Sequence, residues 1–326
     1  ASMELEPVTR ANLVLAKTRI NPKLNFQAAP AESTYHPVDL TVTVQLGFKR
    51  QRRIELAHRQ LDSTNALIRT MAWKIRQDTS LAFYELAVAK KSLSVVEDYL
   101  AVTQRLFSIA QKRKDARDAS GLDVLRADAA VSDAKNQLVQ AQIRVRQATR
   151  QLNILLNRST ENSLNILLPD LLKLETAPPE VPSFPDLLTI AIQHRPEFKQ
   201  IEANRNVQLA SIKLAKSGRW PDVQIGGGIS SVSQTRQTFI GENFTYGPFG
   251  YLSIPLPIND HQQGPEAIAR ATYRQLEAQF EATITQVKQE LNLAYSNFDT
   301  AEEQLDIFLR EILPKQLRIV SLSERG

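Results

Sequence analysis

The 326-residue chain contains no cysteine. It therefore has no disulfide framework, no thiol nucleophile and no cysteine-based zinc site. Its four histidines are scattered and form no H-x-x-x-H pair: His36, His58, His194 and His261. We therefore expect the protein to hold neither a metal ion nor another cofactor.

The sequence also lacks a catalytic triad and a phosphate-binding loop. The glycine run 226–228 lies within a strand pattern and precedes no helix, so it does not resemble a nucleotide-binding turn. Paired carboxylates such as Glu302 and Glu303 lie on the surface of an expected helix. We therefore predict that the protein is not an enzyme.

No run of 18 apolar residues occurs, so the sequence contains no candidate transmembrane helix. A membrane-spanning strand leaves a much weaker hydropathy signal, so membrane insertion stays open at this stage. The net charge is only +5. The arginines of segment 144–150 have helix-surface spacing, and we expect no nucleic-acid partner.

Glycine and proline are absent between Phe48 and Ser120, and this span carries a heptad pattern. Apolar or small residues recur there every 3.5 residues on average, which predicts a long supercoiled helix over residues 49–115. The first seam consists of Ile68, Ala72, Ile75, Thr79, Ala82, Leu86, Ala89, Leu93, Val96 and Leu100. After a short break at Ser120-Gly121, a second seam consists of Val124, Ala127, Val131, Ala134, Leu138, Ala141, Val145, Ala148, Leu152 and Leu155. Two such helices joined by a short turn predict an antiparallel hairpin over residues 49–157.

Four segments have strand patterns: 22–28, 40–48, 222–232 and 249–257. In segment 40–48 apolar residues alternate strictly with small or polar ones, over a length that would also suit a membrane-spanning strand. A half-buried strand of a soluble sheet explains the same pattern. The basic residues of segment 49–53 likewise have two interpretations, the solvated first turns of a helix or a contact with anionic lipid headgroups.

The order of strand, loop, strand and long helix occurs twice, with an offset of 212 residues between the long helices. We predict a first repeat over 1–157 that begins with a short helix at 8–20. A proline-rich linker at 158–186 then leads to a second repeat over 187–326, with helix 187–217 and a long helix 265–323 that Pro314 kinks. Since the second copy has no return helix, we expect the sequence to be truncated at both ends.

Several short segments, taken in order, resemble the outer-membrane efflux protein family of TolC-type factors. They are Asn21-Pro22-Lys23-Leu24, Gly121-Leu122-Asp123-Val124-Leu125-Arg126-Ala127, Leu188 to Glu197 with Arg195-Pro196-Glu197 at its end, Arg219-Trp220-Pro221-Asp222-Val223 before the glycines 226–228, and Tyr251-Leu252-Ser253-Ile254-Pro255-Leu256-Pro257. The likeness extends over nearly the whole chain. In this family a glycine often stands where this chain has Arg117, so the turn between the two helices is a point of departure.

The resemblance implies a mainly helical fold with a small β part. It implies a homotrimer in which each subunit gives four strands to a 12-stranded outer-membrane barrel and long coiled-coil helices to an α-barrel in the periplasm. Loops 29–37 and 233–246 would be extracellular, and 158–186 an equatorial belt. The implied function is that of a passive exit duct in a tripartite efflux or type I secretion system, working with a periplasmic adaptor protein, an inner-membrane pump and outer-membrane lipid.

Two sets of candidate site residues follow from this resemblance. The helical tip would contact the adaptor and pump through Arg113, Arg117, Gly121, Leu122, Asp123, Val124 and Leu125. The polar strand positions would face the barrel lumen: Thr41, Thr43, Gln45 and Gln224. The alternative from the residues alone is a soluble coiled-coil scaffold or adaptor-like structural protein, which explains the heptads and leaves the matched strands unexplained.

Overall fold

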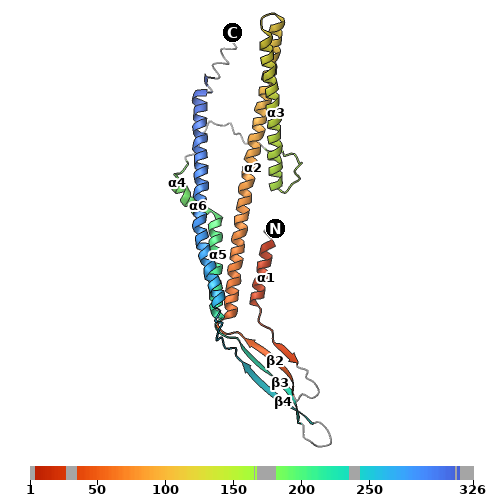
Figure 1. Cartoon of the computed structure of the whole chain (residues 1–326), viewed down its shortest axis with the longest axis vertical. Helices are drawn as coiled ribbons and strands as arrows, with labels where there is room; N and C mark the ends of the chain where they lie inside the picture. Colours follow the sequence, from red (N-terminus) through yellow and green to blue (C-terminus); the bar gives the residue numbers. More distant parts are fainter. Residues whose placement is uncertain are drawn as a thin grey trace. The chain divides into compact units, whose positions relative to one another are not determined.

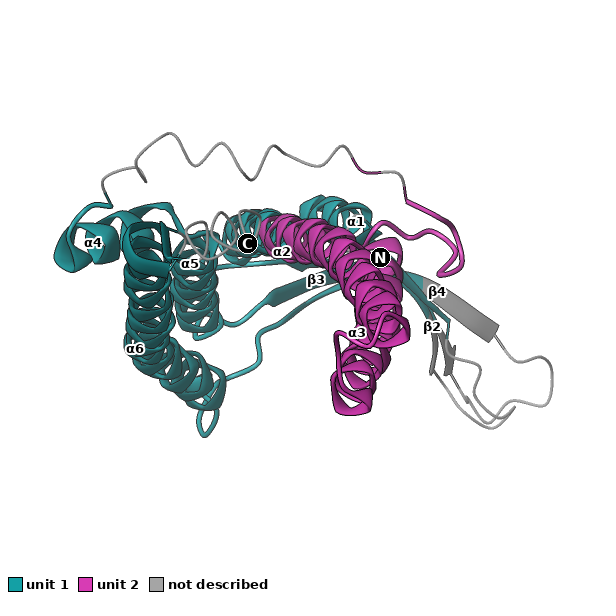
Figure 2. Ribbon diagram, turned by 90° about the horizontal axis from the view of Figure 1, so that it is seen from above, with its two compact units in different colours: residues 1–70, 181–326 teal, residues 71–180 magenta. Residues whose placement is uncertain are grey.

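The computed structural model describes residues 4–26, 35–164, 166, 181–234, 243–312 and 314–315. The chain divides into two compact units, shown in teal and magenta in Figure 2. One unit comprises residues 1–70 and 181–326, and the other comprises residues 71–180.

Long helices dominate the structure, as the heptad pattern predicts (Figure 1). They are α1 (Leu5–Lys17), α2 (Lys49–Asp115), α3 (Gly121–Leu155), α4 (Phe184–His194), α5 (Pro196–Ser217) and α6 (Gln263–Ile307). Among the described residues, no helix combines the length and the apolar character that a membrane crossing requires.

Three predicted helices differ in the structure. The predicted helix 187–217 is two helices, α4 and α5, because Pro196 begins α5 and holds Arg195 in an extended conformation between them. The first helix covers Leu5–Lys17, three residues earlier in the chain than expected. The predicted helix 265–323 is regular only to Ile307, where a π-helical segment, Phe308–Ile312, follows. This segment ends two residues before Pro314, so the helix becomes irregular earlier in the chain than the predicted kink. A proline has no amide proton to donate to the preceding turn, which favours such an irregularity. Residues 313 and 316–323 lie outside the described part of the chain.

Within the unit of residues 71–180, α3 and the second part of α2 form the predicted hairpin. Every predicted seam residue of α3 is buried or half-buried. Ala82 and Leu86 of α2 form a buried cluster with Leu152 of α3. Ala72 and Ile75, which the heptads also place in the seam, are exposed. Since α3 ends at Leu155, next to this cluster, those two positions lie beyond its end.

The start of the predicted linker packs on the same cluster. Leu164 and Ile166 lie against it, and the Lys90 ammonium donates a hydrogen bond to the Leu164 carbonyl at 2.7 Å. The buried Asn153 side chain donates to the Asn162 carbonyl at 2.8 Å. Residues 165 and 167–180 lie outside the described residues. The first part of the linker is therefore anchored to the hairpin.

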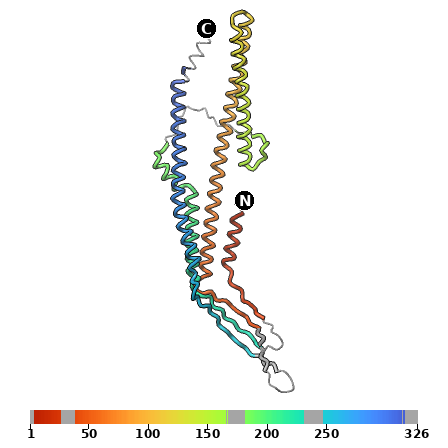
Figure 3. Tube along the Cα trace, in the orientation of Figure 1, coloured from red at the N-terminus to blue at the C-terminus, as the bar shows by residue number. Residues whose placement is uncertain are grey.

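Four antiparallel strands form one sheet in the order β1-β2-β3-β4, and Figure 3 shows β2 beside β3 although they are far apart in the sequence. The strands are β1 (Lys23–Phe26), β2 (Tyr35–Val44), β3 (Val223–Gln234) and β4 (Asn243–Ser253). In the central pair Val42 lies opposite Ile225 and Thr43 opposite Gln224. The two predicted strand pairs therefore join into a single sheet.

The strand boundaries correct the prediction in three places. β2 begins at Tyr35 and ends at Val44, whereas the prediction was 40–48, because Gly47 and Phe48 both have positive φ and turn the chain into α2. β4 ends at Ser253 and not at 257, since Pro255 and Pro257 have no amide proton for the ladder. β1 begins at Lys23 and not at 22, and residues 27 and 28 of the predicted strand lie outside the described residues. The described parts of the predicted loops 29–37 and 233–246 are strand residues, since 35–37 belong to β2, 233–234 to β3 and 243–246 to β4. The rest of both loops lies outside the described residues.

In the unit that holds the sheet, α5 packs along α6. The Phe198 and Phe280 rings meet edge to face at 5.4 Å, and the Arg205 guanidinium lies 5.1 Å from the centre of the Tyr273 ring. The elements α1-β1-β2-α2 and α5-β3-β4-α6 follow one another in the same order, which fits the predicted duplication. The two compact units cut across these repeats, so the repeat boundaries stay a prediction.

Candidate functional site

The two faces of the sheet differ sharply in chemistry. Branched and aromatic apolar side chains along one face are exposed: Leu24, Phe26, Val38, Leu40, Val42, Val44, Ile225, Ile229 and Leu252. On the other face, Asp39 is only 9% exposed and Thr41 only 5% exposed. A sheet of a soluble protein buries its apolar face and exposes its polar one, so this sheet has the inverse arrangement.

A hydrogen-bonded network joins three strands on the polar face. The Tyr251 hydroxyl of β4 donates to the Asp39 carboxylate at 2.9 Å and lies 2.5 Å from the Thr41 hydroxyl. The Asn25 amide of β1 also donates to Asp39, at 2.9 Å. The ring of Tyr251 covers Gly226, where a Cβ atom would overlap it. This network fixes the packing of the polar face across the width of the sheet.

The predicted lumen residues fall on this polar face with one exception. Thr41, Thr43 and Gln224 share the face, and Thr43 and Gln224 lie opposite each other across β2 and β3. Thr41 lies under the Tyr251 hydroxyl and is buried. Gln45 follows the end of β2, and its side-chain oxygen accepts a hydrogen bond from Arg53 at 2.7 Å. The structure therefore groups three of the four residues and places Gln45 at the base of α2.

Sequence reasoning missed the central residues of this network, Asp39 and Tyr251. Neither lies in a motif that marks a site. Their separation is 212 residues, which equals the offset found between the long helices. The two residues are therefore counterparts in the two predicted copies, and their contact follows from the order and register of the strands.

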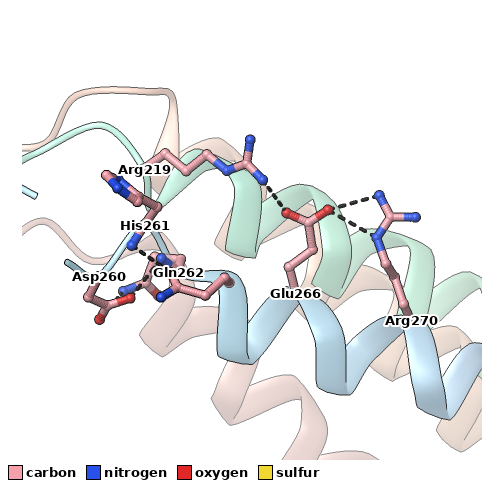
Figure 4. Close-up of polar contacts among 7 residues, drawn as sticks. Arg219, Asp260, His261, Gln262, Glu266 and Arg270 are labelled. Atoms are coloured by element: carbon pink, nitrogen blue, oxygen red, sulfur yellow. Dashed lines mark hydrogen bonds and ion pairs between the residues drawn. The ribbon is translucent and has the colours of Figure 1, made fainter. Parts of the chain in front are cut away.

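Where the sheet meets the helices, ion pairs hold the junction. Lys49, at the start of α2, contacts Asp222, before β3, at 2.7 Å. Figure 4 shows Glu266 of α6 between Arg270, at 2.8 Å, and Arg219, at 2.6 Å. The Glu266 side chain is nearly buried, whereas both guanidinium groups are half-exposed. The hydrogen bond from Arg270 and the two positive charges hold the pKa of Glu266 below its usual value.

Replacing Glu266 with glutamine is expected to weaken the response of stability to acid. The pKa of Glu266 is lower in the folded protein than in the unfolded chain. The ionised Glu266 therefore contributes its full stabilisation of the fold above the unfolded-state pKa of about 4.3, and this contribution is lost as the pH falls through the lower folded-state pKa. Glu266→Gln should lower the melting temperature at pH 7. On acidification, the melting temperature of this variant should fall by less than that of the wild type. Melting curves between neutral and acidic pH measure this. The exposed Glu281→Gln is the control, and parallel pH profiles for wild type and Glu266→Gln would contradict the assignment.

The turn between α2 and α3 forms a Schellman-type helix end. The Asp118 amide donates to the Arg113 carbonyl at 2.8 Å and the Arg117 amide to the Lys114 carbonyl at 2.9 Å. Arg117 has a φ of 66°, the left-handed conformation that glycine usually takes at this position. The tip thus keeps the glycine-type backbone although this chain has arginine there.

A capping box begins α3 on the other side of the turn. The Ser120 hydroxyl accepts from the Asp123 amide at 3.2 Å, and the Asp123 carboxylate accepts from the Ser120 amide at 3.0 Å. The Ser120 hydroxyl also donates to the Asp123 carboxylate at 2.7 Å, and this bond together with the one from the Ser120 amide lowers the pKa of Asp123. Leu122 and Leu125 are exposed, while Val124 is half-buried in the seam. The structure therefore brings the seven predicted tip residues together and turns one of them inward.

Arg117→Gly is expected to stabilise the hairpin by about 1 kcal/mol. The substitution removes the steric cost of a left-handed conformation at a residue with a Cβ atom, and this gain exceeds the larger backbone entropy that glycine loses on folding. Denaturant unfolding followed by circular dichroism measures the free energy. Gly121 has no positive φ, and a Cβ atom there would meet nothing within 4 Å. Gly121→Ala should therefore change stability by about 0.5 kcal/mol or less. A loss of stability in Arg117→Gly would refute this account of the turn.

A sheet with an exposed apolar face, joined to helices of up to 67 residues, is typical of a membrane protein built from strands and carrying long helical extensions. A family model described as outer membrane efflux protein matches residues 7–158 and 187–326. The chain belongs to the outer membrane efflux protein family.

Named relatives and a solved structure agree with this membership. The chain is 22% identical over 305 residues to toxin and drug export protein A of Aggregatibacter actinomycetemcomitans, covering 90% of this chain and 64% of that protein. It is 22% identical over 272 residues to the cobalt-zinc-cadmium resistance protein CzcC of Cupriavidus metallidurans, covering 81% of this chain and 60% of that protein. The chain thus spans less than two thirds of both. A crystal structure of CusC matches its fold with a TM-score of 0.73 and 16% identity, covering 100% of this chain and 78% of that one.

Proposed function

We propose that this chain is one subunit of a homotrimeric exit duct in the outer membrane, with its helices in the periplasm. The duct is passive, and its energy comes from an inner-membrane pump that a periplasmic adaptor protein joins to it. Family membership and the names of two relatives, a toxin and drug export protein and a metal resistance protein, support an export function. They favour a duct over a soluble coiled-coil scaffold.

The inverted sheet is the observation that carries this proposal. Exposed side chains such as Leu40 and Ile225 lie on one face, and the hydrogen-bonded Asp39, Thr41 and Tyr251 lie on the other. In a barrel, the apolar face of the sheet would contact lipid and the polar face would contact water in the lumen. A soluble scaffold would leave the apolar face in water with no compensating contact.

The free edges of the sheet support assembly from several copies. Among the described residues, β1 pairs only with β2, and β4 pairs only with β3. Unpaired strand edges are costly in lipid, and closure into a barrel removes them. Pairing of β4 in one copy with β1 in the next closes a sheet of twelve strands from three copies of four.

The exposed tip is the proposed docking point for the partner proteins. Leu122 and Leu125 present apolar side chains there, next to the exposed Arg113, Arg117 and Asp123. Interfaces commonly combine an apolar centre with a charged rim. Opening of the duct would then require a shift in helix packing near this tip.

Single-channel recording in planar bilayers tests the proposal on the complete natural protein that carries these residues. We expect discrete conductance steps, with Thr43 and Gln224 facing the pore. Gln224→Glu should shift the reversal potential in a salt gradient towards cation selectivity, and Gln224→Lys should shift it in the opposite direction. The absence of conductance from correctly folded protein would overturn the proposed duct.

A further inference from the structure

A pocket of about 540 Å³ opens where β2 ends and α5 approaches the first turn of α2. Two aromatic side chains, Phe48 and Trp220, line one part of it, and three cations, Arg52, Lys213 and Lys216, line another. All of these residues belong to the unit that contains the sheet. The pocket therefore lies within one compact unit, and its walls combine aromatic side chains with positive charge.

The cations in this pocket outnumber the carboxylates that contact them. Glu55 accepts hydrogen bonds from both Lys213, at 2.7 Å, and Arg52, at 2.8 Å. Glu266 is close enough to Lys216 to interact with its charge, but its two oxygens already bind Arg219 and Arg270. The pocket therefore keeps an excess of positive charge, which favours an anionic ligand.

The same pocket continues the exposed apolar face of the sheet. The apolar row of β2 ends at Val44, and Leu46 and Phe48 follow it into the pocket wall. Phe48 is 71% exposed and Trp220 is 62% exposed. Exposed tryptophan next to lysine and arginine is typical of the boundary between lipid tails and headgroups. A ligand with both an apolar tail and an anionic head matches this surface.

We propose that this pocket binds the phosphate headgroup of an anionic phospholipid, whose acyl chains lie along Leu46 and the apolar row of β2. Lys213 and Lys216 bind the phosphate through charge-assisted hydrogen bonds, and Trp220 packs against the upper part of the acyl chains. The inference rests on the proposed position of the sheet in the outer membrane. Of the basic residues at 49–53, only Arg52 lines this pocket, and it already donates to Glu55.

Quenching of Trp220 fluorescence by brominated lipid tests the pocket. The chain has two tryptophans, so Trp73→Phe, with phenylalanine also at any tryptophan outside these 326 residues, leaves Trp220 as the reporter. The complete natural protein carrying this substitution is placed in bilayers of phosphatidylcholine with increasing brominated phosphatidylglycerol, and in parallel bilayers with brominated phosphatidylcholine. We expect half-maximal quenching at about tenfold less phosphatidylglycerol than phosphatidylcholine, from the attraction of two lysines.

The double variant Lys213→Gln, Lys216→Gln should abolish this lipid preference. It keeps Trp220 in place and removes the two ammonium groups that bind the phosphate. Lys199→Gln with Lys288→Gln removes the same charge from exposed positions on α5 and α6 and should leave the preference intact. Circular dichroism of each variant checks that the fold is retained. Excess inorganic phosphate should not displace the lipid, since it has no acyl chain.

The outcomes separate the pocket from the duct. Equal quenching by both lipids would overturn the headgroup site while the membrane position of the sheet stands. Loss of the preference in the Lys199 and Lys288 control, or on addition of inorganic phosphate, would also overturn a specific phospholipid site. Absence of quenching by either lipid would overturn the proposed membrane position together with the site.

Discussion

Gly228→Ala is expected to destabilise the sheet by about 3 kcal/mol, at the upper end of the usual cost of overpacking. A Cβ atom at this position would overlap the backbone carbonyl oxygen of Val38 and lie 2.7 Å from Cα of Asp39. Both are backbone atoms of the paired strand β2, so no side-chain rotation can make room for the methyl group. The β2–β3 pair, which joins the two halves of the sheet, should separate or shift.

The yield of folded protein and its urea unfolding in detergent, followed by the β signal in circular dichroism, measure this effect. Gly250→Ala is a matched control in the neighbouring strand β4, where the closest atom to a new Cβ is the Gly226 carbonyl oxygen at 3.7 Å. That variant should unfold within about 0.5 kcal/mol of the wild type. Equal stability of the two variants would contradict the close approach of β2 and β3.

Leu86→Ala is expected to lower the free energy of unfolding of the hairpin by about 3 kcal/mol. Leu86 is fully buried between α2 and α3, where it packs with Ala82 and Leu152. The change removes apolar contacts and leaves a cavity, because two long helices held by a continuous seam can collapse only slightly around a single position. The Leu86 side chain has no polar partner to lose, so the effect reports packing alone.

Denaturant unfolding followed by the helical signal measures this loss. Leu81, which is 56% exposed on the same helix, gives the control, since Leu81→Ala removes the same atoms from a site largely in water. We expect its cost to stay below about 1 kcal/mol. If Leu81→Ala cost as much as Leu86→Ala, the pairing of the two seams would be wrong.

The hairpin could be predicted from the sequence because helix geometry alone fixes which residues share a face. Val131 and Ala134 of α3 are buried where the heptads place them. Local geometry also explains why α2 begins at Lys49, after the turn at Gly47 and Phe48. The heptads could not show how far the pairing extends. Ile75 is exposed among the described residues because α3 ends at Leu155.

The polar face of the sheet was predicted only in part. Alternation in 40–48 identified Thr41 and Thr43, because a strand turns successive side chains to opposite faces. The contact of Asp39 with Tyr251 depends on the order and register of strands from two distant parts of the chain, which no local pattern contains. The charged pocket at Trp220 is lined by residues of α5 and of the start of α2, which are also far apart in the sequence, so no local pattern indicated it.

Single-cysteine labelling in the outer membrane tests the central claim most directly. These 326 residues contain no cysteine, and any cysteine elsewhere in the complete protein is replaced by serine. Val42 and Thr43 are adjacent in β2 and lie on opposite faces of the sheet. With Thr43→Cys, a membrane-impermeant maleimide should react through the water-filled lumen. With Val42→Cys, lipid should block that reagent and admit only a lipid-soluble one. Equal reaction at both positions, or reaction at position 42 alone, would contradict a sheet with one face in lipid and the other in water.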